Sequence, residues 1–363
     1  MNAGLIVIIL LLVLSILGIP IYLALGIGTL VALNMADMPF IVLPQKLFAG
    51  MNSSSLLAIP FFMLAGNIMS RSITGKLIDV SNALIGWIKG SLAVVTVLAS
   101  ALFGAISGSG VATASAVGGT TIPAMKEEGY PDHFAAAISG IAAILGPIIP
   151  PSITLIVYAS ITDLSVSKLF VGSVIPGILM AVGLIIYALF YGKKNDLPAH
   201  KRKSAKEVLL IFKDSIWALL MPVIILGGIF GGIFTPTESA AVAVVYALLV
   251  SLLIYKDIKI KDIPGIFVDG AISTATILML VGISKSSGYV ITTSGLPHQV
   301  LEVFSSFTNS TVVILLLLNI LFLVIGMLME ANAAIIMMTP ILLPLLDAFG
   351  IDPLQFGIMM SFN

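Results

Sequence analysis

Long runs of hydrophobic residues follow one another along the chain, separated by short polar breaks. A run of about 20 apolar residues is what an α-helix needs to cross a membrane. The pattern therefore predicts an all-α polytopic membrane protein. The expected helices span residues 5–33, 55–70, 78–99, 135–160, 166–191, 215–233, 236–255, 265–290 and 311–329. The short mixed segment 39–50 predicts an interfacial or scaffold helix instead of a span.

Two apolar stretches depart from this pattern. Residues 100–125 read SALFGAISGSGVATASAVGGTTIPAM, with five glycines and many small hydroxyl residues. This composition predicts a re-entrant helical hairpin with its tip near SGSG. The alternative is a tightly packed spanning helix, because small residues also let helices approach closely. The stretch 326–350, GMLMEANAAIIMMTPILLPLLDAFG, is the second expected hairpin.

A third departure is the motif GPIIPPS at 146–152, inside the apolar run 138–161. Proline lacks a backbone N–H and clashes with the preceding helical turn, so this helix is expected to be discontinuous. Backbone groups freed in this way are tolerated at membrane depth where they are buried in protein or line a cavity.

The two glycine-containing stretches align with each other, Gly104 on Gly326 and Pro123 on Pro344, with a one-residue gap. Matching interrupted segments in two halves of a chain point to an internally repeated transporter with its site at the repeat interface. The alternative is coincidence between two apolar segments rich in small residues. We divide the chain into a first inverted repeat (1–191), a connector (192–214) and a second inverted repeat (215–363). A second broken helix is expected after the second hairpin, and the chain ends before it, which favours a C-terminally incomplete sequence.

Composition narrows the function further. Hydrophobic residues make up 59% of the chain and charged residues 9%, and mean hydropathy is +1.18. The formal net charge of zero argues against binding to nucleic acid. The chain has no cysteine, and its three histidines fall near expected loops, so catalysis by histidine and metal sites built from Cys or His are not expected. We therefore expect no catalytic residues and no enzyme.

Basic residues concentrate in one place, GKKNDLPAHKRKSAKE at 192–207, which holds six of the seventeen Lys and Arg residues. The positive-inside rule places this loop in the cytoplasm.

Three charged residues fall within or beside apolar runs. An acid within the membrane is by default a functional candidate. Glu238, however, follows Thr235 and Pro236 in the order of a helix capping box, which favours a structural role. Glu330 has no such cap, and two interpretations stay open for it. One is a functional acid that binds a cation, takes a proton or meets a basic partner, and the other is a buried acid that orders the second hairpin tip. Lys285 is expected to extend to the membrane interface.

Discontinuous helices suggest a transport chemistry. Hard cations such as sodium prefer oxygen ligands, which freed backbone carbonyls and hydroxyl side chains supply. The N-termini of half-helices present partial positive charge to anionic substrates. The pattern favours an ion-coupled carrier of an anion over a simple channel.

Several ordered motifs carry a family resemblance: LLAIPFFMLAGNIM, SGSGVATASAVG, GPIIPPS, GGIFTPTESAA and EANAAIIMMTPILLP. Together they resemble the large membrane subunit of TRAP transporters, the tripartite ATP-independent periplasmic transporters of the dicarboxylate and sialic-acid type. The resemblance implies a bacterial inner-membrane carrier of the elevator type, in which sodium drives uptake of an organic anion. It also implies two partners, a small four-helix membrane subunit and a periplasmic substrate-binding protein.

The resemblance implies site residues as well. Sodium ions are expected at the first tip, at Ser107, Gly108 and Ser109, and at the break, at Gly146, Ile149 and Pro150. Ser55 is a further candidate for the same ion. A second ion site is expected near Gly326. The organic anion is expected at Ser109, Gly110, Pro151, Ser152, Glu330 and Asn332. The family commonly has aspartate where Glu330 stands, so an identical role does not follow.

Two other functions fit the sequence. One is a stand-alone sodium–dicarboxylate carrier of the wider ion-transporter superfamily, and the other is a non-transporting membrane scaffold.

Overall fold

A computed structural model describes residues 2–327 and 329–362. This part of the chain is helical throughout, with short connections and no β-strand. The all-α prediction is confirmed. The α-helices are α1 (Ala3–Ile16), α2 (Ile21–Met35), α3 (Val42–Met51), α4 (Ala58–Ser72), α5 (Thr74–Ile85), α6 (Ser91–Ser107), α7 (Gly110–Thr113), α8 (Gly119–Glu127), α9 (Asp132–Ala143), α10 (Leu145–Ile148), α11 (Ile153–Thr162), α12 (Val166–Lys194), α13 (Ala205–Phe230), α14 (Pro236–Leu249), α15 (Ile263–Thr293), α16 (Leu296–Phe307), α17 (Thr311–Gly326), α18 (Ala331–Ala348) and α19 (Pro353–Phe362). Short 3₁₀ segments are η1 (Ser55–Leu57) and η4 (Ile260–Asp262), and short π segments are η2 (Ala114–Gly118) and η3 (Val250–Ile254).

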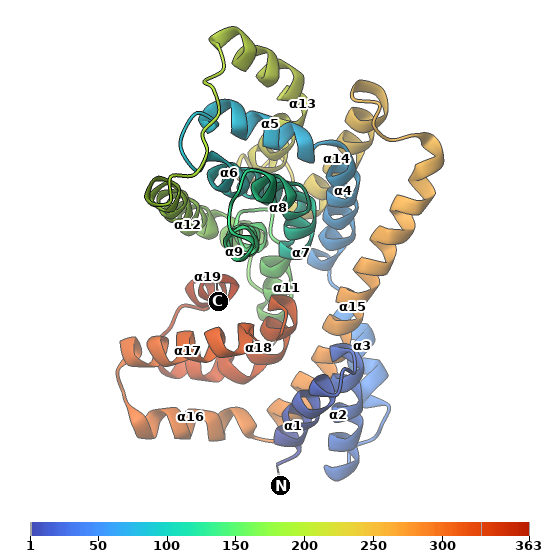
Figure 1. The fold of residues 1–363 in the computed structure, drawn as a ribbon. Helices are drawn as coiled ribbons and strands as arrows, with labels where there is room; N and C mark the ends of the chain where they lie inside the picture. The colour runs from blue at the N-terminus through green and yellow to red at the C-terminus, as the bar shows by residue number, and fades with distance from the viewer. Residues whose placement is uncertain (1, 328, 363) are drawn as a thin grey trace. The chain divides into compact units, whose positions relative to one another are not determined.

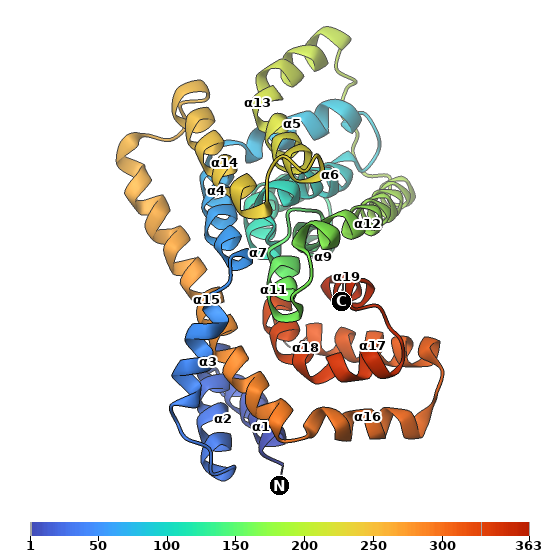
Figure 2. The ribbon, with the colours of Figure 1, turned by 180° about the vertical axis from the view of Figure 1, so that it is seen from behind.

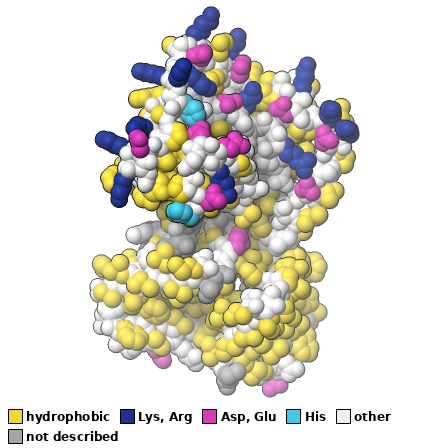
Figure 3. Space-filling model, viewed as in Figure 1, with side chains coloured by type: hydrophobic (Ala, Val, Ile, Leu, Met, Phe, Trp, Pro, Cys, Tyr) yellow, Lys and Arg dark blue, Asp and Glu magenta, His cyan; other side chains and the backbone are white. Residues whose placement is uncertain are grey.

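Several of these helices are long and apolar enough to cross a membrane. Within the described residues, five meet this condition, and up to eight do if each bent helix pair counts as one span. The five are Val166–Lys194, Ala205–Phe230, Pro236–Ile254, Ile260–Thr293 and Ala331–Ala348. Hydrophobic side chains cover much of the visible face over α16 and α17 (Figure 3), as contact with lipid requires. The chain is a multi-pass membrane protein.

Two expected spans prove to be wrong in their boundaries. The run 5–33 is two helices, α1 and α2, because Gly18 takes a left-handed backbone conformation (φ +83°) and Pro20 precedes the second helix. The run 78–99 is divided between α5 and α6, with Gly90 at φ +75° between them. Glycine adopts positive φ at little cost, so it ends helices that hydropathy alone would continue.

The described residues form two compact units that interleave the sequence. The first unit comprises Met1–Leu57, Thr154–Leu169 and Ile272–Asn363; the second comprises Ala58–Ile153 and Phe170–Ala271. Each unit therefore draws on both halves of the chain. The sequence division into two inverted repeats around the connector 192–214 stays a prediction.

The second unit is built around α6, which is buried along almost its whole length. It packs against α4, α5, α9 and α10, and its hydrophobic core extends to α12. Aromatic rings close one side of this core, where Phe134 of α9 stacks on Tyr191 of α12 with centroids 3.7 Å apart. A central helix held on several sides fixes the position of its C-terminal end, at Ser107.

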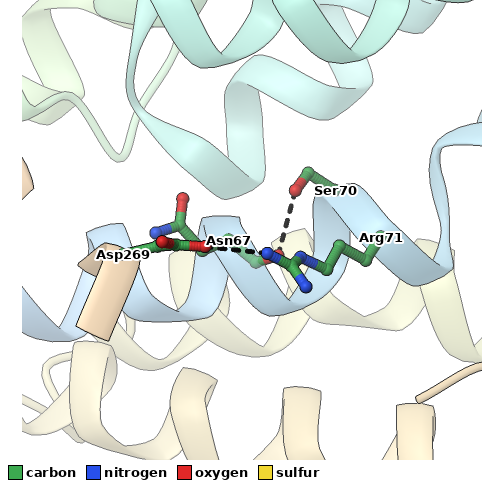
Figure 4. A network of polar contacts seen from close by, with 4 residues as sticks. All are labelled: Asn67, Ser70, Arg71 and Asp269. Atoms are coloured by element: carbon green, nitrogen blue, oxygen red, sulfur yellow. Dashed lines mark hydrogen bonds and ion pairs between the residues drawn. The ribbon is translucent and has the colours of Figure 1, made fainter. Parts of the chain in front are cut away.

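The first part of α15 belongs to the second unit and forms an ion pair with α4. Arg71 of α4 donates to Asp269 of α15 over 2.8 Å, and Ser70 donates to the backbone carbonyl of Asn67 (Figure 4). Both side chains of the ion pair are about half exposed. Exposed pairs of this kind contribute at most ~1 kcal/mol, so this contact adds little to stability.

In the first unit, α1 and α2 form an antiparallel pair, with α2 held against the later part of α15 (Figure 1). The hydroxyls of Thr29 and Ser287 lie 2.6 Å apart, and Ser286 donates to the carbonyl of Leu43. Helices α17 and α18 lie side by side in both views (Figure 2). The second expected hairpin is therefore misplaced at 326–350: α17 and α18 are its two arms, and the segment between them includes Leu328, which lies outside the described residues.

Candidate functional site

The first hairpin tip lies in the second unit, at the SGSG motif. Helix α6 ends at Ser107, and Gly108 turns the chain with φ +63° while its N–H donates to the carbonyl of Gly104 over 2.9 Å. Ser109 is extended, and its hydroxyl accepts from the N–H of Ala112, which caps α7. The tip is where the sequence predicts it, although its arms run from Ser91 to Glu127 instead of from 100 to 125.

The returning arm of this hairpin is irregular. Between α7 and α8 the chain forms the π segment η2, and Pro123 lies inside α8. A π-bulge of this kind changes which side chains face a neighbouring helix, and such bulges occur frequently at functional sites. The predicted hairpin geometry is confirmed within the second unit by contacts of α7, η2 and α8 with α6.

The predicted interruption at GPIIPPS is also confirmed. Helix α10 ends at Ile148, residues 149–152 are not helical, and α11 begins at Ile153. The hydroxyl of Ser152 donates back to the carbonyl of Pro147, and the Pro150–Pro151 peptide bond is cis. Pro150, Pro151 and Ser152 are buried, so the break is inside the protein and not on its surface.

The tip and the break touch each other through their backbones. The N–H of Ile153 donates to the carbonyl of Gly108 over 3.1 Å. A Cβ added to Gly108 would lie 2.5 Å from the carbonyl oxygen of Pro151, closer than side chains ever approach. Only glycine fits at this position, both for space and for its positive φ.

A second close approach brings α10 against the tip and against α6. A Cβ on Gly146 would lie 2.7 Å from both the carbonyl oxygen of Ser109 and the hydroxyl oxygen of Thr113. A Cβ on Gly104 would lie 2.8 Å from the Cα of Gly146. The glycines let α6, the tip and α10 approach to backbone contact, and both Gly104 and Gly146 are buried.

The junction of the tip and the break brings neutral oxygen atoms together. The hydroxyls of Ser107 and Thr113 are buried and lie 3.4 Å apart, and Thr113 donates to the carbonyl of Ser109 over 2.7 Å. Carbonyl and hydroxyl oxygens are the ligands that hard cations take. Without a carboxylate in residues 100–125 or 138–161, this oxygen set suits a monovalent cation better than a divalent one.

Thr113 is a member of this group that the sequence analysis missed. Its hydroxyl is fully buried and contacts both the tip serine and the tip carbonyl. A signal was available, because Thr113 follows Ser109 by four residues and such pairs share a helix face. Threonine hydroxyls also commonly donate to the carbonyl four residues back, which made the residue look ordinary.

The remaining expected site residues lie in the first unit. Glu330 is the N-terminal cap residue of α18, and its carboxylate accepts from the side-chain amide of Asn332. The amide oxygen of Asn332 is buried and without a hydrogen-bond partner among the described residues. Because Ser55 (in η1) and Gly326 (at the end of α17) also belong to the first unit, their assignment to ion sites stays a prediction.

Glu238 and Lys285, the other two charged candidates, make contacts that support the structure of their helices. Thr235 and Glu238 form the expected capping box of α14, with the backbone N–H of Thr235 donating to the Glu238 carboxylate over 2.8 Å. Lys285 of α15 packs its aliphatic stem against Gly50, where an added Cβ would lie 2.5 Å from Cγ of the lysine. The capping interpretation of Glu238 is confirmed.

Comparison with known proteins places these features in a family context. The model of the family described as "Tripartite ATP-independent periplasmic transporter, DctM component" matches residues 8–363. The chain is similar to "Uncharacterized protein YgiK" of Salmonella typhimurium, with 41% identity over 95% of this chain and 80% of that protein. It is similar to "C4-dicarboxylate TRAP transporter large permease protein DctM" of Pseudomonas aeruginosa, with 40% identity over 88% of this chain and 75% of the relative. It is also similar to "Isethionate TRAP transporter permease protein DctMQ" of Oleidesulfovibrio alaskensis, with 37% identity over 95% of this chain and 55% of that protein.

Proposed function

Because this chain belongs to the DctM component family of the tripartite ATP-independent periplasmic transporters, we propose that it is the large membrane permease of a sodium-coupled transporter for an organic anion. The observation that carries the proposal is the buried junction of hairpin tip and helix break, where neutral oxygens from two discontinuous elements meet. Such a junction carries no permanent charge, and its neutral oxygens can serve as ligands to a cation.

The coupling ion of this proposal is Na⁺, bound at the tip and the break. Its ligands come from Ser107, Gly108, Gly146, Ile149 and Pro150, and we add Thr113 for its buried hydroxyl. An ion there would neutralise the partial negative charge of carbonyls at the C-terminal ends of α6 and α10. Ser55 and Gly326 remain candidates for this ion and for a second one.

The substrate of this proposal is a small organic anion, such as a C4-dicarboxylate, a sialic acid or a related carboxylate. The names of two relatives refer to C4-dicarboxylate and isethionate, which share a small size and an anionic group. The residues proposed to contact the substrate are Ser109, Gly110, Pro151 and Ser152 at the first tip and break, and Glu330 and Asn332 at the second tip.

The proposed assembly has two further components, as the word "tripartite" in the family description implies. One is a small four-helix membrane subunit and the other is a periplasmic binding protein that delivers the substrate. A relative named DctMQ, longer than this chain, is compatible with fusion of two membrane components into one polypeptide. The assembly lies in the bacterial inner membrane with the basic loop 192–207 in the cytoplasm, and it works by an elevator movement of two inverted repeats.

Transport in proteoliposomes tests this proposal. The chain is reconstituted with its small membrane subunit, and substrate uptake is measured with an inward sodium gradient, with and without the purified binding protein. We expect uptake only when both are present. Uptake driven by sodium without the binding protein would favour a stand-alone carrier, and no uptake under any condition would favour a non-transporting scaffold.

A further inference from the structure

A groove in the second unit lies outside the transport site. It has a volume of about 490 Å³ and is lined by the end of α5, the segment that follows it and the beginning of α13. Its apolar lining comes from both sides, and Arg202 and Lys203 add two cations to the lining. The lining residues are Ala83, Leu84, Trp87, Arg202, Lys203, Ala205, Val208, Leu209 and Phe212.

The loop that brings the two cations to this groove is anchored at three points. The N–H of Gly90 donates to the carbonyl of Pro198, and the N–H of His200 donates to the carbonyl of Gly86. Nε2 of His200 also lies 2.8 Å from Oε1 of Glu128. These contacts hold the loop against the segment between α5 and α6 and against the end of α8, so the groove is a built feature of the fold.

An ion pair adds a further attachment at the other end of the same loop. Lys89 donates to Asp196, and this hydrogen bond and charge lower the pKa of the Asp196 carboxyl. The acidic residue is thereby occupied with Lys89. Arg202 and Lys203 line the groove itself, and basic side chains gather around the beginning of α13 and the end of α12 (Figure 3).

The groove has the chemistry of a membrane interface. Trp87 is 46% exposed, and the guanidinium of Arg202 lies over its ring, 5.2 Å from the centroid. Leu84 and Leu209 are also exposed, at 48% and 71%. Tryptophan and basic residues are enriched where the hydrocarbon core meets the lipid headgroups, and exposed leucines at such a level face acyl chains.

We propose that this groove binds an anionic phospholipid, with its phosphate at Arg202 and Lys203 and part of one acyl chain along Leu84, Val208 and Phe212. The two cations complement the charge of a phosphate, and the apolar lining complements an acyl chain. A lipid therefore fits the groove better than a free phosphate, which would leave the apolar walls without a partner. Basic pockets at membrane-spanning helices bind anionic headgroups, at ~1 kcal/mol for each cation near the surface. The proposal concerns lipid binding and stands apart from the proposed transport activity.

Fluorescence of Trp87 tests it directly. The chain has two tryptophans, so the variant Trp217→Phe leaves Trp87 as the only tryptophan, and it lies in the groove. The full chain is reconstituted in phosphatidylcholine vesicles that contain a fixed minor fraction of dibromostearoyl phosphatidylglycerol or dibromostearoyl phosphatidylcholine. Bromine quenches tryptophan on contact, so the quenching ratio of the two lipids, each normalised to the unquenched emission of the same variant, reports local preference.

We expect phosphatidylglycerol to quench Trp87 more strongly than phosphatidylcholine, and the preference to fall about fivefold for each cation removed by Arg202→Gln or Lys203→Gln. The matched control is Lys193→Gln with Lys194→Gln, which removes two charges from the same basic loop outside the groove and should keep the preference. Equal quenching by both lipids would overturn the proposal. So would loss of the preference in the control, or displacement of the brominated lipid by inorganic phosphate.

Discussion

At the residue scale, Gly146 is a position where little space is available for a side chain. A Cβ there would lie 2.7 Å from Ser109 O and from the Thr113 hydroxyl, and neither atom is the end of a flexible chain. We expect Gly146→Ala to destabilise the protein by ~1–3 kcal/mol through overpacking and to abolish any stabilisation by sodium. Thermal unfolding of the purified protein, in sodium and in choline buffers, measures both effects.

The control for this substitution is Gly140→Ala, on the exposed side of α9 with nothing within 4 Å of the added Cβ. Alanine is a better helix former than glycine, so this variant should be unchanged or more stable by up to about 1 kcal/mol. If Gly146→Ala were as stable as Gly140→Ala, the close contact at the junction would not exist.

The second prediction at this scale concerns the buried hydroxyl of Thr113. Thr113→Val keeps the shape of the side chain and removes its buried hydroxyl, whereas Thr113→Ser keeps the hydroxyl. If Thr113 contributes a ligand, the valine variant should need about tenfold more sodium for half-maximal transport, equivalent to ~1.4 kcal/mol, and the serine variant should stay near the parent.

Thr120→Val is the matched control, because Thr120 lies on the same hairpin arm, is exposed and donates to the carbonyl of Ala116. Equal sodium dependence in the valine and serine variants of Thr113 would remove this residue from the proposed site.

The sequence was most informative about glycines and prolines, because few structures other than an irregular backbone explain these residue types inside an apolar run. Glycines at a predicted tip and prolines inside an apolar run both implied irregular backbone, and the structure has both the turn at Gly108 and the break after Ile148. Thr113 lies four residues after Ser109, a spacing that was available as a local signal, whereas the pairing of Gly104 with Gly146 could not be predicted. That pairing is a contact between segments about forty residues apart, which no local pattern specifies.

At the element scale, substitutions at the start of α14 test whether Thr235 and Glu238 serve helix stability or transport. Thr235→Ala removes a cap whose hydroxyl accepts from the N–H of Glu238 and should cost about 1 kcal/mol of stability. Glu238→Gln should cost no more than this, because glutamine also serves in a capping box. Chemical denaturation gives the stability, and sodium-dependent uptake gives the activity.

Because the Glu238 carboxylate is occupied by the backbone N–H and hydroxyl of Thr235, we expect the sodium dependence of both variants to match the parent. Thr235→Ser serves as control, since it keeps the capping oxygen. A large change in sodium dependence for Glu238→Gln at unchanged stability would show that this acid acts in transport.

Element boundaries were less predictable than element type. Long apolar runs indicated α12 and α15 to within a few residues. Helix α13 begins at Ala205, ten residues before the expected start and inside the expected connector 192–214, because its first turns are polar. The helices α1 and α2 were merged, and α5 and α6 were divided in the wrong place, because a single glycine with positive φ interrupts a helix without lowering hydropathy. Helix α16 was missed since its residues 296–307 mix polar and apolar side chains between two longer runs.

At the scale of the whole molecule, the two compact units do not follow the two halves of the sequence. Each unit collects segments from before and after the basic loop, and α12 and α15 each contribute residues to both. A sequence alignment of two halves compares local segments and carries no information about which segments share a core. Units that exchange segments in this way are compatible with one body moving against another, as an elevator movement requires.

The native chain allows this movement to be tested because it has no cysteine. A panel of double-cysteine variants, with one cysteine in the first unit and one in the second, is reconstituted with the small subunit and treated with a bifunctional cross-linker. An elevator has two stable arrangements and a ligand shifts the population between them. We expect some pairs to cross-link in sodium with substrate and a different set in sodium-free buffer. Pairs placed within one unit, such as Arg71 with Asp269, which lie in contact and are about half exposed, should give the same yield in both conditions. A single cross-linking pattern under all conditions would contradict the elevator mechanism while leaving the family assignment intact.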